Sequence, residues 1–239
     1  MPALMNLPMN FQLLSQVQGV QDDFLNYSSG NLWTTVATDS GSATVSDAAN
    51  GELAISPSDG TVADNDETYV KATTEVLLFA ADRAIVFVAS VKWTEGNVDD
   101  LNVAAGFMNA VGANSILDDG GGPKASFSGA VFYKIDGETV WRVRSSVGTT
   151  YTDTKTNITA GGSAYQELRI EFTAIDTTTG TVSFLIDGAI ATDTNGKPIK
   201  HQLTYTGATE AQAFVGAKNG AATTVETLKV DYAGWFQSR

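Results

Sequence analysis

Apolar and polar residues alternate along the stretch from residue 168 to residue 188. The apolar positions are Leu168, Ile170, Phe172, Ala174, Val182, Phe184 and Ile186. Because successive side chains of a strand point to opposite faces, this period of two predicts two antiparallel strands with one buried face. Residues 176–180 supply a turn between the two strands, and the Asp187-Gly188 pair supplies a second one at the far end.

The same alternation recurs along most of the chain after residue 21. Further strands are predicted at 32–37, 52–56, 68–79, 85–94, 101–110, 129–135, 140–147, 212–217 and 224–236. The strand over 85–94 is expected at the centre of a sheet, because both of its faces are largely apolar. Asn-Gly or Asp-Gly pairs begin at positions 50, 59, 119, 136, 187, 195 and 219 and predict tight turns. No segment has the 3.6-residue period of a long helix.

These strands predict an all-β fold. They are too numerous for one open sheet, so we expect a two-sheet antiparallel β-sandwich of the jelly-roll type. A chain of 239 residues with 43% hydrophobic content can build this sandwich as a single domain, predicted to span 21–239. Residues 1–20 contain no charged side chain and form a separate apolar arm. The arm is expected to dock on its own domain or on another subunit, and a disordered tail is the remaining alternative.

The net charge of −13 rests on only 14 Lys and Arg residues. Nucleic-acid binding is therefore not expected, because no large basic surface is available to neutralise phosphates. The chain has no Cys, which excludes disulfides and thiolate metal sites. The N-terminus lacks the basic and continuous apolar segments of a signal peptide, and no run is long enough to span a bilayer. A soluble protein with no membrane partner is expected.

Catalytic patterns are weak. The single histidine, His201, is predicted to be an ordinary strand or loop residue, and no G-x-S-x-G nucleophile motif is present. Glycoside hydrolases need two carboxyl groups flanking the scissile bond. Glu167 and Glu171 share a face of the predicted strand, but Arg169 lies between them and favours a paired, ionised arrangement. We therefore predict that the protein is not an enzyme.

Three acidic segments could offer oxygen ligands to calcium, at 64–67, 118–122 and 193–196. Turn chemistry is the favoured interpretation for all three, with calcium as an alternative for the first two. Neither a metal nor another cofactor is predicted. Arg142 and Arg144 are predicted to decorate a solvated face, with ligand binding as the alternative. The segment 112–128 is the least strand-like part of the chain and is a candidate functional loop.

Two resemblances follow from the placed strands. Across 22–237, the segments Asp23-Phe24 to Trp33, LRIEF (168–172) and VSFLIDG (182–188) resemble concanavalin A-like, laminin-G-like jelly-roll domains. The segments 101–134 and 193–205 resemble structural proteins encoded beside the major capsid protein of tailed bacteriophages. In that class, such sandwiches serve as head decoration or cement proteins, often as trimers, or as parts of fibres.

The second resemblance implies a virion structural protein on the outer capsid surface, made in the host cytoplasm. Its expected partner is the major capsid protein, and the subunit is expected to form a homo-oligomer, with a trimer suspected. The apolar arm would make the capsid or subunit contact through Leu4, Met5, Leu7, Met9, Phe11, Leu13 and Leu14.

The alternative hypothesis is a carbohydrate-binding module, or a tail or head fibre domain that recognises a glycan. Exposed aromatic platforms would then be required, and the candidates are Trp93, Trp141 and Trp235. Because Trp93 and Trp141 lie among alternating apolar residues, both are expected to pack in the core instead.

Overall fold

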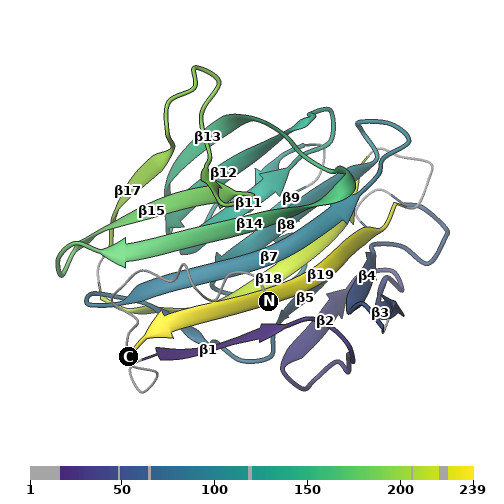
Figure 1. The fold of residues 1–239 in the computed structure, drawn as a ribbon, viewed down its shortest axis with the longest axis horizontal. Helices are drawn as coiled ribbons and strands as arrows, with labels where there is room; N and C mark the ends of the chain where they lie inside the picture. Colours follow the sequence, from purple (N-terminus) through teal and green to yellow (C-terminus); the bar gives the residue numbers. More distant parts are fainter. Residues whose placement is uncertain (1–16, 48, 64–65, 118–119, 206, 221–225) are drawn as a thin grey trace.

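The computed structural model describes residues 17–239 except 48, 64–65, 118–119, 206 and 221–225. Two antiparallel sheets face each other across one core, and no α-helix occurs in the described part of the chain (Figure 1). This architecture confirms the predicted all-β, two-sheet sandwich. None of the described segments forms a helix of the length and hydropathy that a membrane crossing requires.

Each sheet brings together strands that are far apart in the sequence. The nine-stranded sheet has the order β16 (Ala189–Ile190), β15 (Thr179–Ile186), β14 (Gly162–Ala174), β7 (Ala84–Trp93), β19 (Leu228–Ser238), β4 (Glu52–Ser56) and β3 (Ser42–Asp47), with β1 (Val17–Asp22) paired to β19 and β17 (Lys200–Thr204) paired to β15. The eight-stranded sheet has the order β13 (Thr150–Thr159), β12 (Val140–Val147), β11 (Gly129–Lys134), β8 (Leu101–Met108), β18 (Thr209–Asn219), β5 (Glu67–Ala72) and β2 (Trp33–Ala37), with β6 (Leu77–Phe79) paired to β18. A separate hairpin joins β9 (Ile116–Leu117) to β10 (Gly122–Pro123).

The inner faces of the sheets carry the apolar positions that the alternation predicts. Ile85 and Phe87 of β7 are fully buried and lie opposite Phe172 and Ile170 of β14. Fully burying a side chain of this kind contributes roughly 1.5–3 kcal/mol, so the register is strongly specified. β7 lies between β14 and β19, which confirms its predicted central position.

The predicted turns next to β15 are also confirmed. The Oδ1 atom of Asp176 accepts hydrogen bonds from the backbone N–H groups of Thr178 and Thr179, both at 2.7 Å. Between β15 and β16, Asp187 and Gly188 have φ angles of 52° and 77°. Positive φ angles at both central residues match the twist of the flanking strands in a tight hairpin.

Some strands differ from the prediction. The run expected over 68–79 is divided into β5 and β6, both of which pair with β18. The carbonyl of Ala72, at the end of β5, accepts a hydrogen bond from the side chain of Gln212 at 3.1 Å. β3, β13 and β17 were not predicted, and residues 17–20, assigned to the arm by composition, lie in β1.

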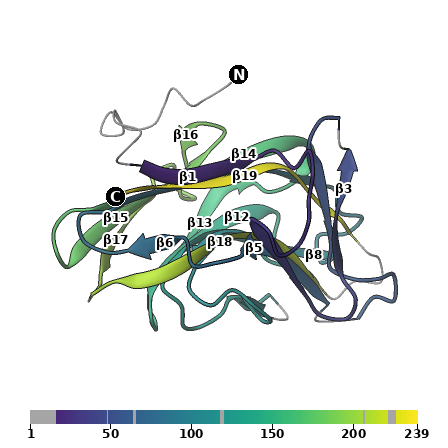
Figure 2. The same ribbon diagram turned by 90° about the horizontal axis from the view of Figure 1, so that it is seen from below.

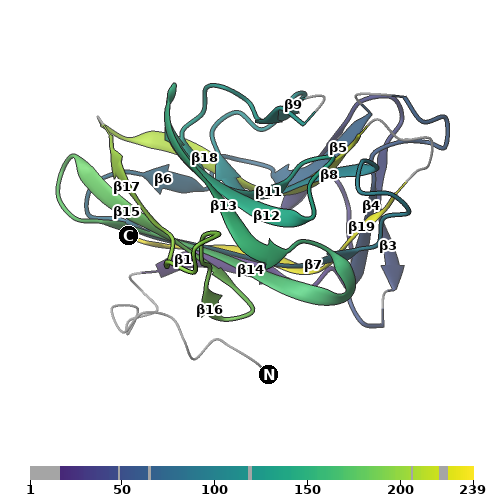
Figure 3. The same cartoon turned by 90° about the horizontal axis from the view of Figure 1, so that it is seen from above.

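The hairpin β9–β10 adds cover to the outside of the sandwich. Figure 2 shows the two sheets as separate layers, with β14 and β19 in one and β5, β8 and β18 in the other. Figure 3 shows β9 beyond the eight-stranded sheet, on the side away from the core. Ile116 and Phe127 pack there in a second buried apolar cluster with Tyr69, Met108 and Phe214. This cover leaves the β12 and β13 side of the same outer face for polar residues.

Candidate functional site

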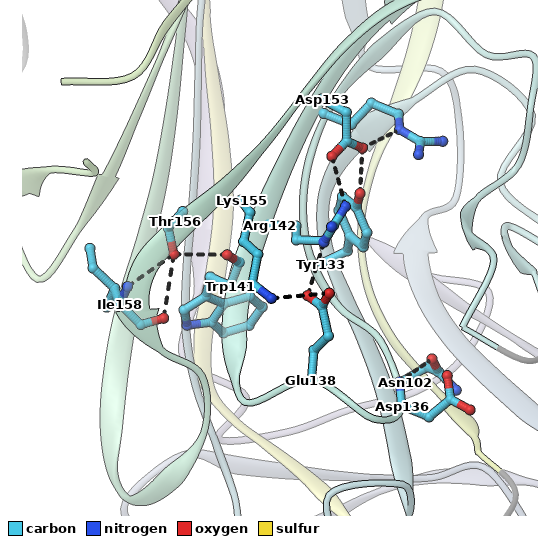
Figure 4. A network of polar contacts seen from close by, with 11 residues as sticks. Asn102, Tyr133, Asp136, Glu138, Trp141, Arg142, Asp153, Lys155, Thr156 and Ile158 are labelled. Atoms are coloured by element: carbon cyan, nitrogen blue, oxygen red, sulfur yellow. Dashed lines mark hydrogen bonds and ion pairs between the residues drawn. The ribbon is translucent and has the colours of Figure 1, made fainter. Parts of the chain in front are cut away.

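β12 and β13 place charged side chains on the outer face of the eight-stranded sheet. Because the residues that alternate with Arg142 and Arg144 are buried in the core, both arginines point outward. The register places Arg144 opposite Asp153 and Arg142 opposite Lys155, and the last two residues are labelled in Figure 4. Glu138 reaches the same place from the turn before β12. We define the β12–β13 face as Glu138, Arg142, Arg144, Tyr151, Asp153 and Lys155.

The five charged groups of this face form a chain of contacts that alternates in sign. Arg144 Nε donates to Asp153 Oδ2 at 2.7 Å, and Arg142 Nη1 donates to Asp153 Oδ1 at 3.2 Å. Arg142 Nε also donates to Glu138 Oε2 at 2.9 Å. Finally, Lys155 Nζ lies 3.2 Å from Glu138 Oε1. The chain therefore begins with Arg144 and ends with Lys155, so both of its ends are cations.

A buried tyrosine contacts Asp153, near the middle of this row of charged groups. The hydroxyl of Tyr133, on β11, donates a hydrogen bond to Asp153 Oδ2. Burial, followed by the charge of Asp153 and this hydrogen bond, raises the pKa of Tyr133 above its usual value of 10. The phenol consequently stays protonated and keeps Asp153 in position between the two arginines.

The segment that contains β9 and β10 forms one wall of the face. The carbonyl of Pro123 accepts a hydrogen bond from Arg144 Nη1 at 2.8 Å. The same segment is held by Lys124, which donates to the carbonyl of Ala110 at 2.6 Å, and by the buried Lys218, which donates to Asn114 Oδ1 at 3.0 Å. The bond to Pro123 connects the loop predicted over 112–128 directly to the charged residues of the β12–β13 face.

Tyr151 supplies an exposed aromatic ring at the Arg144 end of the face. Its side chain is 53% exposed, and the guanidinium carbon of Arg144 lies 4.5 Å from the ring centroid. The ring also borders a groove of about 390 Å³ between β13 and β17, whose polar lining includes Thr152, Gln202 and Thr204. A flat ring next to fixed polar groups suits a ligand that has both apolar and polar surfaces.

The tryptophans proposed as exposed platforms are all buried. Trp93 and Trp141 pack edge to face with ring centroids 5.3 Å apart, which confirms their predicted place in the core. Trp235 packs against Trp33 at 5.2 Å in the same geometry. None of the three can therefore present a ring to a ligand.

Arg142 and Arg144 lie on the outer face of the sheet, as predicted, but they do not merely face solvent there. Their side chains are only 28% and 12% exposed, and both are engaged in ion pairs. The reason is that β13 lies beside β12 and places Asp153 opposite Arg144. The alternation in β12 alone gave no sign of this neighbour.

The structure does not assemble a glycoside-hydrolase pair from the carboxylates considered above. Arg169 Nη2 lies 2.5 Å from Glu171 Oε1, so the predicted pairing is present, while Glu167 accepts a hydrogen bond from Tyr232. On the β12–β13 face, the guanidinium of Arg142 binds both Glu138 and Asp153. It thus occupies the space between the two carboxylates where a scissile bond would have to lie.

His201 lies on β17, as an ordinary strand residue, and joins the two sheets. Its Nδ1 is 2.8 Å from Ser145 Oγ, and its Nε2 is 3.0 Å from Thr154 Oγ1. Burial lowers the pKa of His201 from its usual 6.5 to about 4, against a smaller opposing effect of Asp153. Because Ser145 and His201 are both buried and the third partner is a threonine, this is no accessible catalytic triad.

The acidic segments that lie in the described part of the chain serve local structure. Asp66 Oδ2 accepts a hydrogen bond from the backbone of Ala63 at 2.9 Å, and Asp193 Oδ1 accepts two within its own turn. Among the described residues, no three His, Cys, Asp or Glu side chains are grouped to hold a metal ion. Residues 64–65 and 118–119 lie outside the described residues. So do the predicted contact residues of the arm, which are Leu4, Met5, Leu7, Met9, Phe11, Leu13 and Leu14.

The fold and this face define a concanavalin A-like jelly roll with a polar outer site, and comparison with solved structures supports the fold. The carbohydrate recognition domain of Emp47p is similar with a TM-score of 0.61 and 12% identity, over 94% of this chain and 98% of that chain. Lectin I from Ulex europaeus, solved in complex with the methyl glycoside of α-L-fucose, has a TM-score of 0.57 and 11% identity, over 93% and 98%. An endo-1,3-β-glucanase from Streptomyces sioyaensis has a TM-score of 0.58 and 16% identity, over 94% and 97%.

These TM-scores, at identities of 11–16%, establish the fold alone and leave the activity to be argued from the site. No protein-family model and no curated protein sequence matches the chain. The similar structures include carbohydrate recognition domains and lectins as well as this glucanase. The capsid partner, the trimer and the virion location remain predictions from the sequence.

Proposed function

We propose that the protein is a non-enzymatic carbohydrate-binding domain whose sugar site is the β12–β13 face. The observation that carries this proposal is the half-exposed ring of Tyr151 beside fixed hydrogen-bonding groups. A sugar ring has an apolar face that can cover an aromatic ring and a rim of hydroxyl groups that need donors and acceptors. The likeness of the fold to lectins and a carbohydrate recognition domain supports the same function.

Preorganisation is the physical basis of binding at this face. Arg142, Arg144 and Asp153 hold one another in place, so little side-chain entropy is lost when a sugar replaces water. Hydrogen bonds that involve charged groups contribute about 1.5–3 kcal/mol each, and an aromatic contact adds roughly 0.5–1.5 kcal/mol. The groove beside Tyr151 gives room for a second sugar unit of an oligosaccharide.

A glycan array tests this function with the intact chain. The wild-type protein should retain a small set of glycans, and Tyr151→Phe, which keeps the ring, should retain the same set. Tyr151→Ala should weaken binding about tenfold, as expected for the loss of about 1.4 kcal/mol. The matched control is Ile175→Ala, because Ile175 is 61% exposed and lies outside the face. Retention of no glycan, or equal binding by Tyr151→Ala, would refute the proposal.

A further inference from the structure

The order of charges on the β12–β13 face leaves both of its ends positive. The chain runs Arg144, Asp153, Arg142, Glu138, Lys155, with contacts of 2.7, 3.2, 2.9 and 3.2 Å. Each carboxylate is shared by two cations, whereas each terminal cation contacts only one of these carboxylates. The face thus holds three positive and two negative groups in a protein whose net charge is −13.

We propose that the Arg144 end of this face binds the anionic group of an acidic sugar, with a uronate carboxylate as the ligand. This inference rests on the proposed function and specifies the class of sugar. The incoming carboxylate would continue the alternation of charge beyond Arg144. The sugar ring that carries it would lie on the exposed ring of Tyr151, which contacts the same guanidinium.

Arg144 is fixed in a geometry that suits this role. Its Nε and Nη1 atoms are bound by Asp153 and by the carbonyl of Pro123. Among the described residues, none accepts a hydrogen bond from its Nη2 atom. Its side chain is 12% exposed and lies between the rings of Tyr133, at 5.6 Å, and Tyr151, at 4.5 Å. A guanidinium held in this way has the N–H groups of Nη2 left to donate a charge-assisted hydrogen bond to an oxygen of an incoming carboxylate.

Lys155, at the other end, fits a supporting role. Its side chain is 43% exposed and has one ion pair, with Glu138. Exposed pairs of this kind contribute little and rearrange easily. Lys155 would therefore raise the local positive potential and steer an anionic ligand without fixing its orientation.

Titration calorimetry with matched sugars tests the charge preference on the wild-type protein. The probes are an oligogalacturonate, its methyl ester, a neutral galacto-oligosaccharide of equal length and a sulfated one. The oligogalacturonate should bind at least about tenfold more tightly than its ester, and added salt should reduce this difference. Tight binding of the sulfated probe alone would replace the uronate by a sulfate ester and refute the stated ligand.

Variants locate the anion. Arg144→Gln should remove most of the preference for acid over ester, while Lys155→Gln should reduce it by a smaller factor. Lys197→Gln, at an exposed lysine outside the face, is the matched control. Circular dichroism checks that Arg144→Gln is folded. If it is not, the comparison of the acid with the ester on the wild-type protein still tests the inference. Equal binding of acid and ester would overturn the inference and leave glycan binding intact, whereas an array on which no glycan is retained would overturn both.

Discussion

Acidification should destabilise the protein through its single histidine. His201 is buried between the two sheets, where Ser145 and Thr154 occupy both ring nitrogens, and burial lowers its pKa to about 4. In the unfolded chain the imidazole regains its usual pKa of 6.5. The unfolded state therefore binds the proton more readily whenever the pH is below 6.5, and acid favours unfolding.

The size of the effect follows from the two pKa values. At pH 7 the folded chain is neutral and only about a quarter of the unfolded chains carry the proton, so nearly all of the contribution of His201 to stability is present. At pH 5 the unfolded chain is mostly protonated and the folded chain mostly neutral, which costs about 2 kcal/mol of the free energy of unfolding. The loss continues as the pH falls and levels off below the folded pKa of about 4.

Urea unfolding of the wild type and His201→Gln at pH 7, 6 and 5 measures this contribution. Glutamine can still hydrogen-bond Ser145 and Thr154 but does not titrate, so the variant reports the pH dependence of all other groups. The wild type should lose about 2 kcal/mol more than the variant between pH 7 and pH 5. Because the chain has one histidine, equal pH dependence of the two proteins would refute this account of His201.

Three further substitutions test the packing by thermal or urea unfolding. Trp141→Ala should cost about 3–5 kcal/mol by opening a core cavity, and a loss below about 1 kcal/mol would contradict its place in the core. Lys134→Met should lower the free energy of unfolding by about 3–5 kcal/mol, because Glu95 loses its buried partner. The control, Lys197→Met at an exposed lysine, should leave the free energy of unfolding unchanged. Gly188→Ala should lower the free energy of unfolding by about 1–2 kcal/mol, because a residue with a Cβ atom is strained at the φ of 77° that Gly188 adopts. An unchanged stability would contradict that hairpin geometry.

The parts of the fold that bury one apolar face were predictable from the sequence. The strands around Ile85 and Leu168 alternate with a period of two because each alternate side chain enters the core. The free energy of burial selects this pattern strongly. The sandwich, its central strand and its aspartate-glycine turn could therefore be predicted from one sequence. The aromatic residues inside such patterns, including Trp141, were accordingly predictable as core.

The candidate site was hidden because it lies on a strand without an apolar face. Residues 150–159 of β13 read TYTDTKTNIT, and β13 is the last strand of its sheet, with β12 as its neighbour in the strand order. With polar side chains on both faces, only the frequent threonines indicate a strand. Tyr151 and Asp153 were missed for this reason, and the engagement of Arg144 by Asp153 is a cross-strand contact that one strand's pattern does not reveal.

The central claim is that the protein binds a glycan on the β12–β13 face. Two-dimensional NMR of the isotope-labelled chain, titrated with the most tightly retained glycan, tests the function and the place together. The account predicts saturable shifts concentrated in the backbone amides of residues 142–155, with the largest near Arg144 and Tyr151. Saturable shifts centred on the nine-stranded sheet, or no shifts with any array glycan, would contradict it.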